Sequence, residues 1–165
     1  MKHIDSPRLK YTLFKKQDVT FYKALVMDAE VMRFISGDPL TEEAASTRFE
    51  KALALSKLLP GSGYYLANNG DYKIGFCKIQ LFQKGELEIG FVVATKFQGK
   101  GFASEMVQGM LEYIDANLKN YKVLALVDMN NKGSIHVLEK SGFVYEETKK
   151  HNGFISGFYV LPVKS

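Results

Sequence analysis

The stretch Gln98-Gly99-Lys100-Gly101-Phe102-Ala103 joins an apolar segment to an amphipathic one. The residues before it, 88–94, are typical of a strand, and residues 102–118 carry apolar side chains at helical spacing. Two glycines let backbone N–H groups approach a ligand closely, because no Cβ stands in the way. N–H groups at a helix start lack partners and carry partial positive charge. The sequence therefore predicts a loop that binds a phosphate or pyrophosphate.

The length and composition of the chain fit one domain, residues 1–165, with a full core. The sequence is 46% hydrophobic and 24% charged, and no apolar run approaches the roughly 20 residues of a membrane span. The first seven residues hold no apolar segment of a secretory signal. The single cysteine, Cys77, excludes an internal disulfide, and we expect it to be a buried small hydrophobe. These features predict a cytoplasmic protein.

The charge of the chain is modestly basic, with a formal net charge of +4. Such an excess favours an anionic cofactor or simply gives a solvated, lysine-rich surface. The basic residues are scattered, whereas a dedicated nucleic-acid binder usually concentrates them. We therefore expect no direct contact with nucleic acid.

The order of strand and helix patterns is β-α-α-β-β-β-α-β-α-β-β. This order predicts an α/β (α+β) domain in which an antiparallel front half meets a parallel crossover at the glycine loop. Asp18 and Thr41 are expected to cap the first two helices. We expect strands at 8–14, 64–67, 72–82, 86–94, 121–127, 143–148 and 154–161, and helices at 18–28, 41–58, 102–118 and 133–140.

Two well-known phosphate loops fit the stretch poorly. The nucleotide triphosphate loop G-x-x-x-x-G-K-[ST] fails, since Ala94 stands five residues before Gly99 and Gly101 stands where Ser or Thr would bind magnesium. The dinucleotide pattern G-x-G-x-x-G is matched only in part, because Ser104 occupies its third glycine position. The loop also follows an antiparallel meander rather than opening a βαβ unit.

A third pattern fits better, because Gln98, Gly101 and Ala103 resemble the pyrophosphate loop of the GNAT superfamily of N-acetyltransferases. Residues 131–143, from an asparagine to a Glu-Lys-Ser-Gly-Phe ending, resemble a second segment of that family. Within the family, stretches such as Ser6-Pro7-Arg8-Leu9 and Glu88-Ile89-Gly90-Phe91 resemble the subgroup that acetylates ribosomal-protein N-termini. The resemblance covers about residues 6–161. It implies a GNAT-like fold: a mixed, mostly antiparallel central sheet flanked by helices.

The resemblance also implies acetyl-CoA as the cosubstrate. In the family the pantetheine arm pairs like an added strand with the backbone before the loop, and the loop N–H groups hold the pyrophosphate. Lys100 would add charge there, and Asn131 would contact the arm. The cofactor-binding residues implied are Phe91, Val92, Val93, Gln98, Gly99, Lys100, Gly101, Phe102, Ala103, Asn131 and Ser134.

The candidate general base is Glu88. Strand alternation places Glu86, Glu88 and Gly90 on one face, and a carboxylate there is suited to accept a proton from an amine directly or through water. The competing interpretation is a solvent-facing carboxylate or the partner of a lysine. Many family members carry a tyrosine as acid where this chain has Leu138. Ser134 is then either a substitute proton donor or only a helix-start hydroxyl.

These observations predict an acetyl-CoA-dependent N-acetyltransferase (an acyltransferase, EC 2.3.1.-) in which a primary amine attacks directly in a ternary complex. The amine is a protein N-terminus or a small molecule, and we expect its site among residues 31–40, the Glu88 strand and the hairpin 149–154. We expect no metal, since neither His136 nor His151 has a second ligand at zinc-like spacing. We also expect no membrane contact and a monomer or homodimer. The alternatives are a non-catalytic acyl-CoA-binding or sensing module and a ribosome-associated module.

Overall fold

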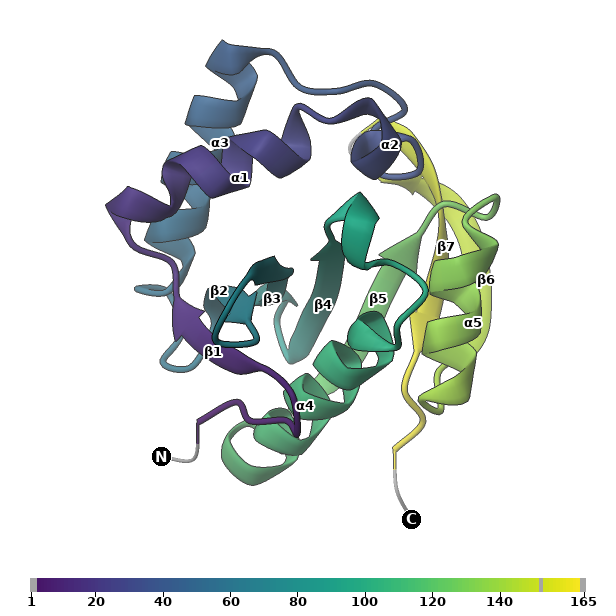
Figure 1. Cartoon of the computed structure of the whole chain (residues 1–165). Helices are drawn as coiled ribbons and strands as arrows, with labels where there is room; N and C mark the ends of the chain where they lie inside the picture. Colours follow the sequence, from purple (N-terminus) through teal and green to yellow (C-terminus); the bar gives the residue numbers. More distant parts are fainter. Residues whose placement is uncertain (1–2, 152, 164–165) are drawn as a thin grey trace.

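The computed structural model describes residues 3–151 and 153–163, so position 152 of the expected acceptor hairpin lies outside the described residues. The described strands form one mixed sheet in the order β1-β2-β3-β4-β5-β7-β6 (Figure 1). The expected fold class is confirmed. The strands are β1 (Lys10–Leu13), β2 (Gly63–Asn68), β3 (Lys73–Gln83), β4 (Glu86–Val93), β5 (Lys122–Val127), β6 (Val144–His151) and β7 (Phe154–Val160).

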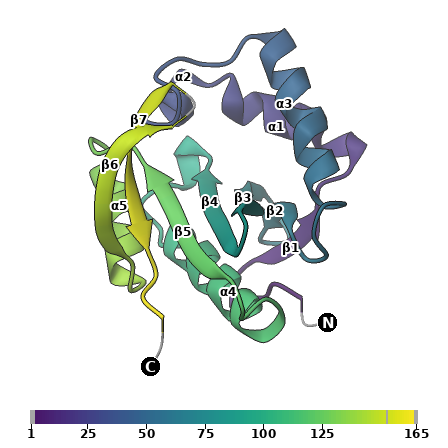
Figure 2. The same cartoon turned by 180° about the vertical axis from the view of Figure 1, so that it is seen from behind.

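The helices lie on both faces of the sheet, with α4 and α5 on one face and α1 and α3 on the other (Figure 2). The order of elements matches the expected one, with one short helix and two 3-10 turns added in connections that the sequence pattern left as loops. The helices and turns are η1 (Lys16–Asp18), α1 (Val19–Val26), α2 (Ala29–Met32), α3 (Glu42–Leu55), η2 (Thr95–Phe97), α4 (Phe102–Asn117) and α5 (Lys132–Lys140).

Of the two expected helix caps, the structure confirms one and contradicts the other. Thr41 caps α3 as expected, because its hydroxyl accepts a hydrogen bond from the Ala44 N–H at 3.1 Å. The prediction that Asp18 caps α1 is wrong, since its carboxylate instead accepts from the Lys15 N–H at 2.8 Å and closes the η1 turn. Asp28 caps the unexpected α2 by accepting from the N–H groups of Glu30 and Val31.

The pairing of β4 changes along its length. On one side it pairs with β3 in antiparallel register from end to end. On the other side it pairs with β5 in parallel, and only Glu86, Leu87 and Glu88 take part, opposite residues 122–124. Beyond that point, among the residues that the structure describes, β5 is paired with β7 alone. The two central strands therefore diverge after Glu88 and leave part of the β4 edge without a strand partner.

The core has two parts, one on each face of the sheet. The α4 side buries Leu87 and Ile89 against helix residues such as Met106 and Met110. The α1/α3 side buries an aromatic group, with Phe14 in ring contact with Tyr22, Phe49, Tyr64 and Phe76. Burial on both faces anchors the sheet between the two layers of helices. Cys77 is fully buried in strand β3, as expected.

The close approach of β3 to the open part of β4 yields a stability prediction. A Cβ on Gly75 would lie 2.0 Å from the Val92 carbonyl oxygen, so Gly75→Ala must displace backbone. We expect it to lower the free energy of unfolding by about 1–3 kcal/mol or more. Gly85→Ala is the control, because Gly85 has φ +80° but open space around it and incurs only the backbone strain. Urea unfolding measures both, and equal losses would contradict the close packing of β3 on β4.

Candidate active site

The gap between β4 and β5 exposes strand-edge backbone groups. The Val92 carbonyl oxygen lies against Gly75 of β3, so the backbone groups of Val92 face β3. Because backbone groups alternate along a strand, those of Phe91 and Val93 face the gap. The three residues expected to pair with a pantetheine arm, Phe91, Val92 and Val93, therefore face two different sides of β4. Phe91 and Val93 are oriented for strand addition, whereas the backbone groups of Val92 already serve β3.

The glycine loop follows directly from this open edge. Gly99 and Gly101 have φ values of +76° and +82°, a left-handed conformation that favours glycine. The Gln98 side chain donates to the Val93 carbonyl oxygen at 3.1 Å and so ties the loop to the end of β4. Within residues 3–151 and 153–163, the backbone N–H groups of 99–104 have no protein acceptor. These N–H groups and the helix dipole of α4 make the loop suited to an anion.

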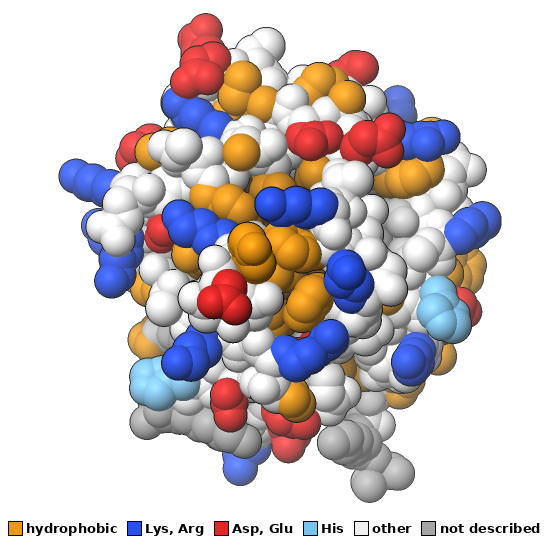
Figure 3. Space-filling model, in the orientation of Figure 1, with side chains coloured by type: hydrophobic (Ala, Val, Ile, Leu, Met, Phe, Trp, Pro, Cys, Tyr) orange, Lys and Arg blue, Asp and Glu red, His pale blue; other side chains and the backbone are white. Residues whose placement is uncertain are grey.

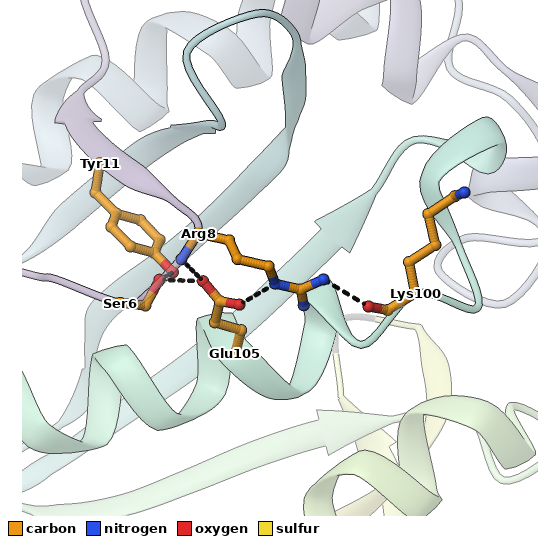
Figure 4. A network of polar contacts seen from close by, with 5 residues as sticks. All are labelled: Ser6, Arg8, Tyr11, Lys100 and Glu105. Atoms are coloured by element: carbon orange, nitrogen blue, oxygen red, sulfur yellow. Dashed lines mark hydrogen bonds and ion pairs between the residues drawn. The ribbon is translucent and has the colours of Figure 1, made fainter.

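The side chains of the other loop residues differ in their exposure to solvent. The Phe102 ring is buried, in edge contact with Phe97 at 6.4 Å between centroids, so only its N–H belongs to the loop surface. Ala103 is half-buried against the core. The Lys100 side chain is exposed and extends away from the N-terminal segment (Figure 4). Lys100 therefore adds an exposed positive charge to the loop.

An arginine from the N-terminal segment reaches the same loop, which the sequence did not predict (Figure 4). Arg8 Nη1 donates to the Lys100 carbonyl oxygen at 3.0 Å, and Arg8 Nε donates to Glu105 Oε1 at 2.7 Å. The guanidinium carbon lies 4.3 Å from the centre of the Phe102 ring. Glu105 also accepts from the Ser6 hydroxyl at 2.6 Å and from the Arg8 backbone N–H at 2.8 Å. Glu105 thus joins the start of α4 to the segment before β1.

The second predicted segment lies beyond the end of β5, the other wall of the gap. The Asn131 side-chain oxygen accepts from the Ser134 N–H at 3.1 Å, so Asn131 caps α5. Its amide nitrogen is not used by that cap. The Ser134 side chain is half-buried in the first turn of α5. Leu138 is only 1% exposed and packs in the core, which leaves no polar side chain at that position.

Glu88 lies on the face of the sheet opposite α4 and is held by two side chains of β3. Gln80 Nε2 donates to one carboxylate oxygen at 2.7 Å, and Lys78 Nζ lies 3.3 Å from the other. Burial lowers the pKa of Lys78, but the neighbouring Tyr64 and Glu88 outweigh it, so the pKa lies above its ordinary value. Lys78 therefore remains protonated at neutral pH.

The two β3 residues were missed from the sequence, although a signal was present. Lys78 and Gln80 alternate with apolar residues in an otherwise buried strand, and the register places them opposite Gly90 and Glu88. Of the two interpretations of Glu88, the structure shows a lysine partner. It does not show a solvent-facing carboxylate, since only 8% of the residue is exposed. An ion-paired carboxylate keeps lone pairs that can still accept a proton.

The described residues carry no group of three or more His, Cys, Asp or Glu side chains that could hold a metal ion. Among the same residues, none of the helices is long and apolar enough to cross a membrane. On the face shown in Figure 3, Lys and Arg side chains surround an apolar centre and do not merge into one basic patch.

A comparison with known families places these features in context. The family model described as "Acetyltransferase (GNAT) domain" matches residues 8–144, which is most of the chain. The chain therefore belongs to the GNAT acetyltransferase family, and the resemblance inferred from the loop is confirmed.

Particular relatives differ in the amine that their names give. Spermidine N(1)-acetyltransferase of Escherichia coli is 24% identical over 161 residues, covering 92% of this chain and 81% of that protein. The GNAT acetyltransferase of Bacillus anthracis has a TM-score of 0.77 at 24% identity, covering 95% of both chains. RimL, a ribosomal L7/L12 α-N-protein acetyltransferase solved with coenzyme A, has a TM-score of 0.77 at 16% identity, covering 95% of this chain and 96% of that one. These structural similarities establish the fold and do not identify the amine acceptor.

The Glu105 contacts predict a pH-dependent stability. Burial raises the pKa of this carboxyl, but the hydrogen bonds from Ser6 and Arg8 outweigh it, so the pKa lies below its ordinary value in the folded state. A lowered folded-state pKa stabilises the protein above the unfolded-state pKa, and this contribution is lost as the pH falls through the folded-state value.

We therefore expect Glu105→Gln to lower the free energy of unfolding by about 1–3 kcal/mol at neutral pH. The difference from the unsubstituted protein should shrink below about pH 4.5. Urea unfolding from about pH 7 to about pH 3 measures this. Glu112→Gln, at an exposed position of the same helix, is the control. A Glu105→Gln deficit that stays constant with pH would contradict the assignment.

Proposed function

We propose that this chain is an acetyl-CoA-dependent N-acetyltransferase acting on a primary amine. The observation that carries the proposal is the divergence of β4 and β5 after Glu88, with the glycine loop at the end of the open edge. A pantetheine arm can add to that edge through the backbone groups of Phe91 and Val93. Its pyrophosphate then reaches the N–H groups of 99–104. The thioester end lies toward the paired part of the strands, near Glu88.

The reaction needs a neutral amine and an exposed thioester in one complex. The amine nitrogen attacks the thioester carbonyl carbon, the C–S bond breaks, and the electron pair leaves on the coenzyme A sulfur. The amine proton passes to a base, and backbone N–H groups at the edge of β4 stabilise the oxyanion that forms. Direct attack leaves no acetyl group on the enzyme, which agrees with the full burial of the single cysteine, Cys77.

Glu88 is the proposed base, acting directly or through water. It lies one residue before the open edge, on the face away from α4. Lys78 and Gln80 hold the carboxylate in one orientation, which fixes the direction from which it accepts a proton. An α-amino group has a pKa of about 7.7–8.0, against about 10.4 for a lysine side chain, and so needs less assistance from such a base.

The protein offers fewer groups to protonate the departing coenzyme A sulfur than to accept the proton of the amine. Leu138 is buried core, and the Ser134 hydroxyl is the proposed proton donor at the start of α5. Coenzyme A can also leave as a thiolate. The buried leucine is the one observation that favours the second candidate function, a non-catalytic acyl-CoA-binding module. Turnover with any amine excludes that candidate.

The acceptor site is proposed on the face of the sheet that carries Glu88, where the thioester would be presented. The α2 helix lies on that face, since Val31 and Met32 pack in the cluster with α1 and α3. The β6–β7 hairpin reaches β3, since the His151 ring lies 5.1 Å from the Phe82 ring. The acceptor is a protein N-terminal amine, as the name of RimL gives for that protein, or a small amine, as for the spermidine acetyltransferase.

Calorimetric titration with acetyl-CoA tests the cofactor assignment. We expect micromolar binding by the unsubstituted protein, none of comparable strength with NADH or ATP, and loss of acetyl-CoA binding in Gly101→Val. Valine has no room in the left-handed conformation of Gly101 and would displace the loop N–H groups. Gly85→Val is the matched control, because Gly85 has nearly the same φ, +80°, in the β3–β4 turn. Binding that survives Gly101→Val in a folded protein would contradict the proposal.

Steady-state kinetics with an amine acceptor test the base. We expect Glu88→Gln to lower kcat by about 100-fold at neutral pH, with a smaller deficit at high pH, where the amine is already neutral. Glu86→Gln, two residues away on the same face, is the control and should change kcat little. If Glu88→Gln keeps most of kcat across the pH range, Glu88 is not the base.

A further inference from the structure

The N-terminal segment forms a strap across the first turns of α4. This strap, residues 4–9, is anchored by the buried side chains of Ile4 and Leu9 and closed by the bridge between Asp5 and Lys10. It passes close to the helix backbone because Gly109 has no side chain, and a Cβ there would lie 3.1 Å from the Asp5 carbonyl oxygen. The strap therefore has a fixed position relative to α4.

From that position one strap residue reaches the loop. The Arg8 guanidinium is fixed by Glu105 through its Nε and by the Phe102 ring beneath it, while its Nη1 donates to the Lys100 carbonyl oxygen at 3.0 Å (Figure 4). The carbonyl oxygen and the following N–H of a planar trans peptide point in opposite directions. Since Arg8 holds the Lys100 carbonyl on the strap side, the Gly101 N–H points to the opposite side of the loop.

This constraint matters because the peptide lies between two glycines. Gly99 and Gly101 both have positive φ, and a Cβ added at Gly99 would meet open space. A peptide flanked in this way has little local resistance to rotation, since glycine adopts both signs of φ readily. Gln98 holds the start of the loop through Val93, but that hydrogen bond does not fix the Lys100–Gly101 peptide.

We propose that Arg8 is a positioning residue of the pyrophosphate loop: it fixes the Lys100–Gly101 peptide so that the Gly101 N–H faces the pyrophosphate of the cofactor. The inference rests on the proposed function, since it takes the cofactor to be a coenzyme A thioester. Fixing the peptide before binding reduces the ordering that binding must impose, and the cofactor affinity rises accordingly. Arg8 acts through the loop and takes no part in the acetyl transfer.

The test compares two acetyl donors in Arg8→Ala. Acetyl-CoA has the pyrophosphate, and acetyl-pantetheine has the same thioester arm without it. We expect the acetyl-CoA KM and the calorimetric Kd for coenzyme A to rise about tenfold or more, as for the loss of a charge-assisted hydrogen bond. The kcat at saturating acetyl-CoA and the kcat/KM for acetyl-pantetheine should stay unchanged. A general folding defect would lower kcat/KM for both donors alike.

Two further variants separate the positioning of the loop peptide by Arg8 from the effect of its positive charge. Lys10→Ala removes one positive charge from the same part of the chain without touching the loop contacts, and we expect coenzyme A affinity close to that of the unsubstituted protein. Arg8→Lys keeps the charge, but a single ammonium cannot hold both Glu105 and the Lys100 carbonyl, so we expect most of the affinity to be lost. Arg8→Lys also serves if Arg8→Ala does not fold.

The possible failures are distinguishable. If the unsubstituted protein does not bind coenzyme A, the proposed function fails and the inference falls with it. If it binds and Arg8→Ala binds equally well, the function stands and the inference is overturned. Equal losses in Arg8→Ala and Lys10→Ala overturn it too, since the effect would then be one of net charge. Equal losses with both donors would assign Arg8 a merely structural role.

Discussion

The divergence of β4 from β5 is the constraint on which the rest of the site depends. Backbone groups at a strand edge need partners, and an unpaired edge inside a sheet is costly unless a ligand or side chain satisfies it. Here the parallel pairing stops at Glu88, and one of the exposed groups, the Val93 carbonyl, is taken by Gln98. The remaining edge is open to a strand-like ligand, which is the shape of a pantetheine arm.

The same divergence determines where the loop lies. The chain leaves β4 at Val93, turns through η2 and enters α4, which packs against the sheet on its way to β5. The N-terminus of α4 therefore meets the end of the open edge, and no side chain caps it. The Glu105 carboxylate in the first turn of α4 is favourable to the helix but opposes an anion. Arg8 balances this charge while it holds the loop.

The sequence predicted correctly those features whose residues lie next to one another in the chain. The glycine loop, the strand before it and the helix after it are contiguous in the sequence, and the structure shows all three where they were expected. Asp18 was assigned to the wrong backbone group because an aspartate near a helix start can bond backwards as readily as forwards. The short α2 was missed because four residues carry no periodicity.

The contacts that sequence reasoning missed are those that depend on register or on long separation. Arg8 and Glu105 are 97 positions apart, and nothing in either neighbourhood indicates the other. Lys78 and Gln80 were visible as polar residues in an apolar strand, but only the β3–β4 register shows that they face Glu88. The candidate base could therefore be named from strand alternation, whereas its partners could not.

The ion pair between Lys78 and Glu88 gives Glu88 a structural role beside its proposed role as the base. Glu88 keeps a half-buried lysine charge compensated beside Gly90, where the Lys78 side chain lies across the strand. Removing one member of such a pair leaves the other charge without compensation, which destabilises the site whatever the chemistry is. A loss of activity at position 88 is therefore informative about catalysis only through its dependence on pH. A missing charge partner impairs the site whatever the protonation state of the amine, whereas the loss of a base lowers the rate least at high pH, where the amine is already neutral.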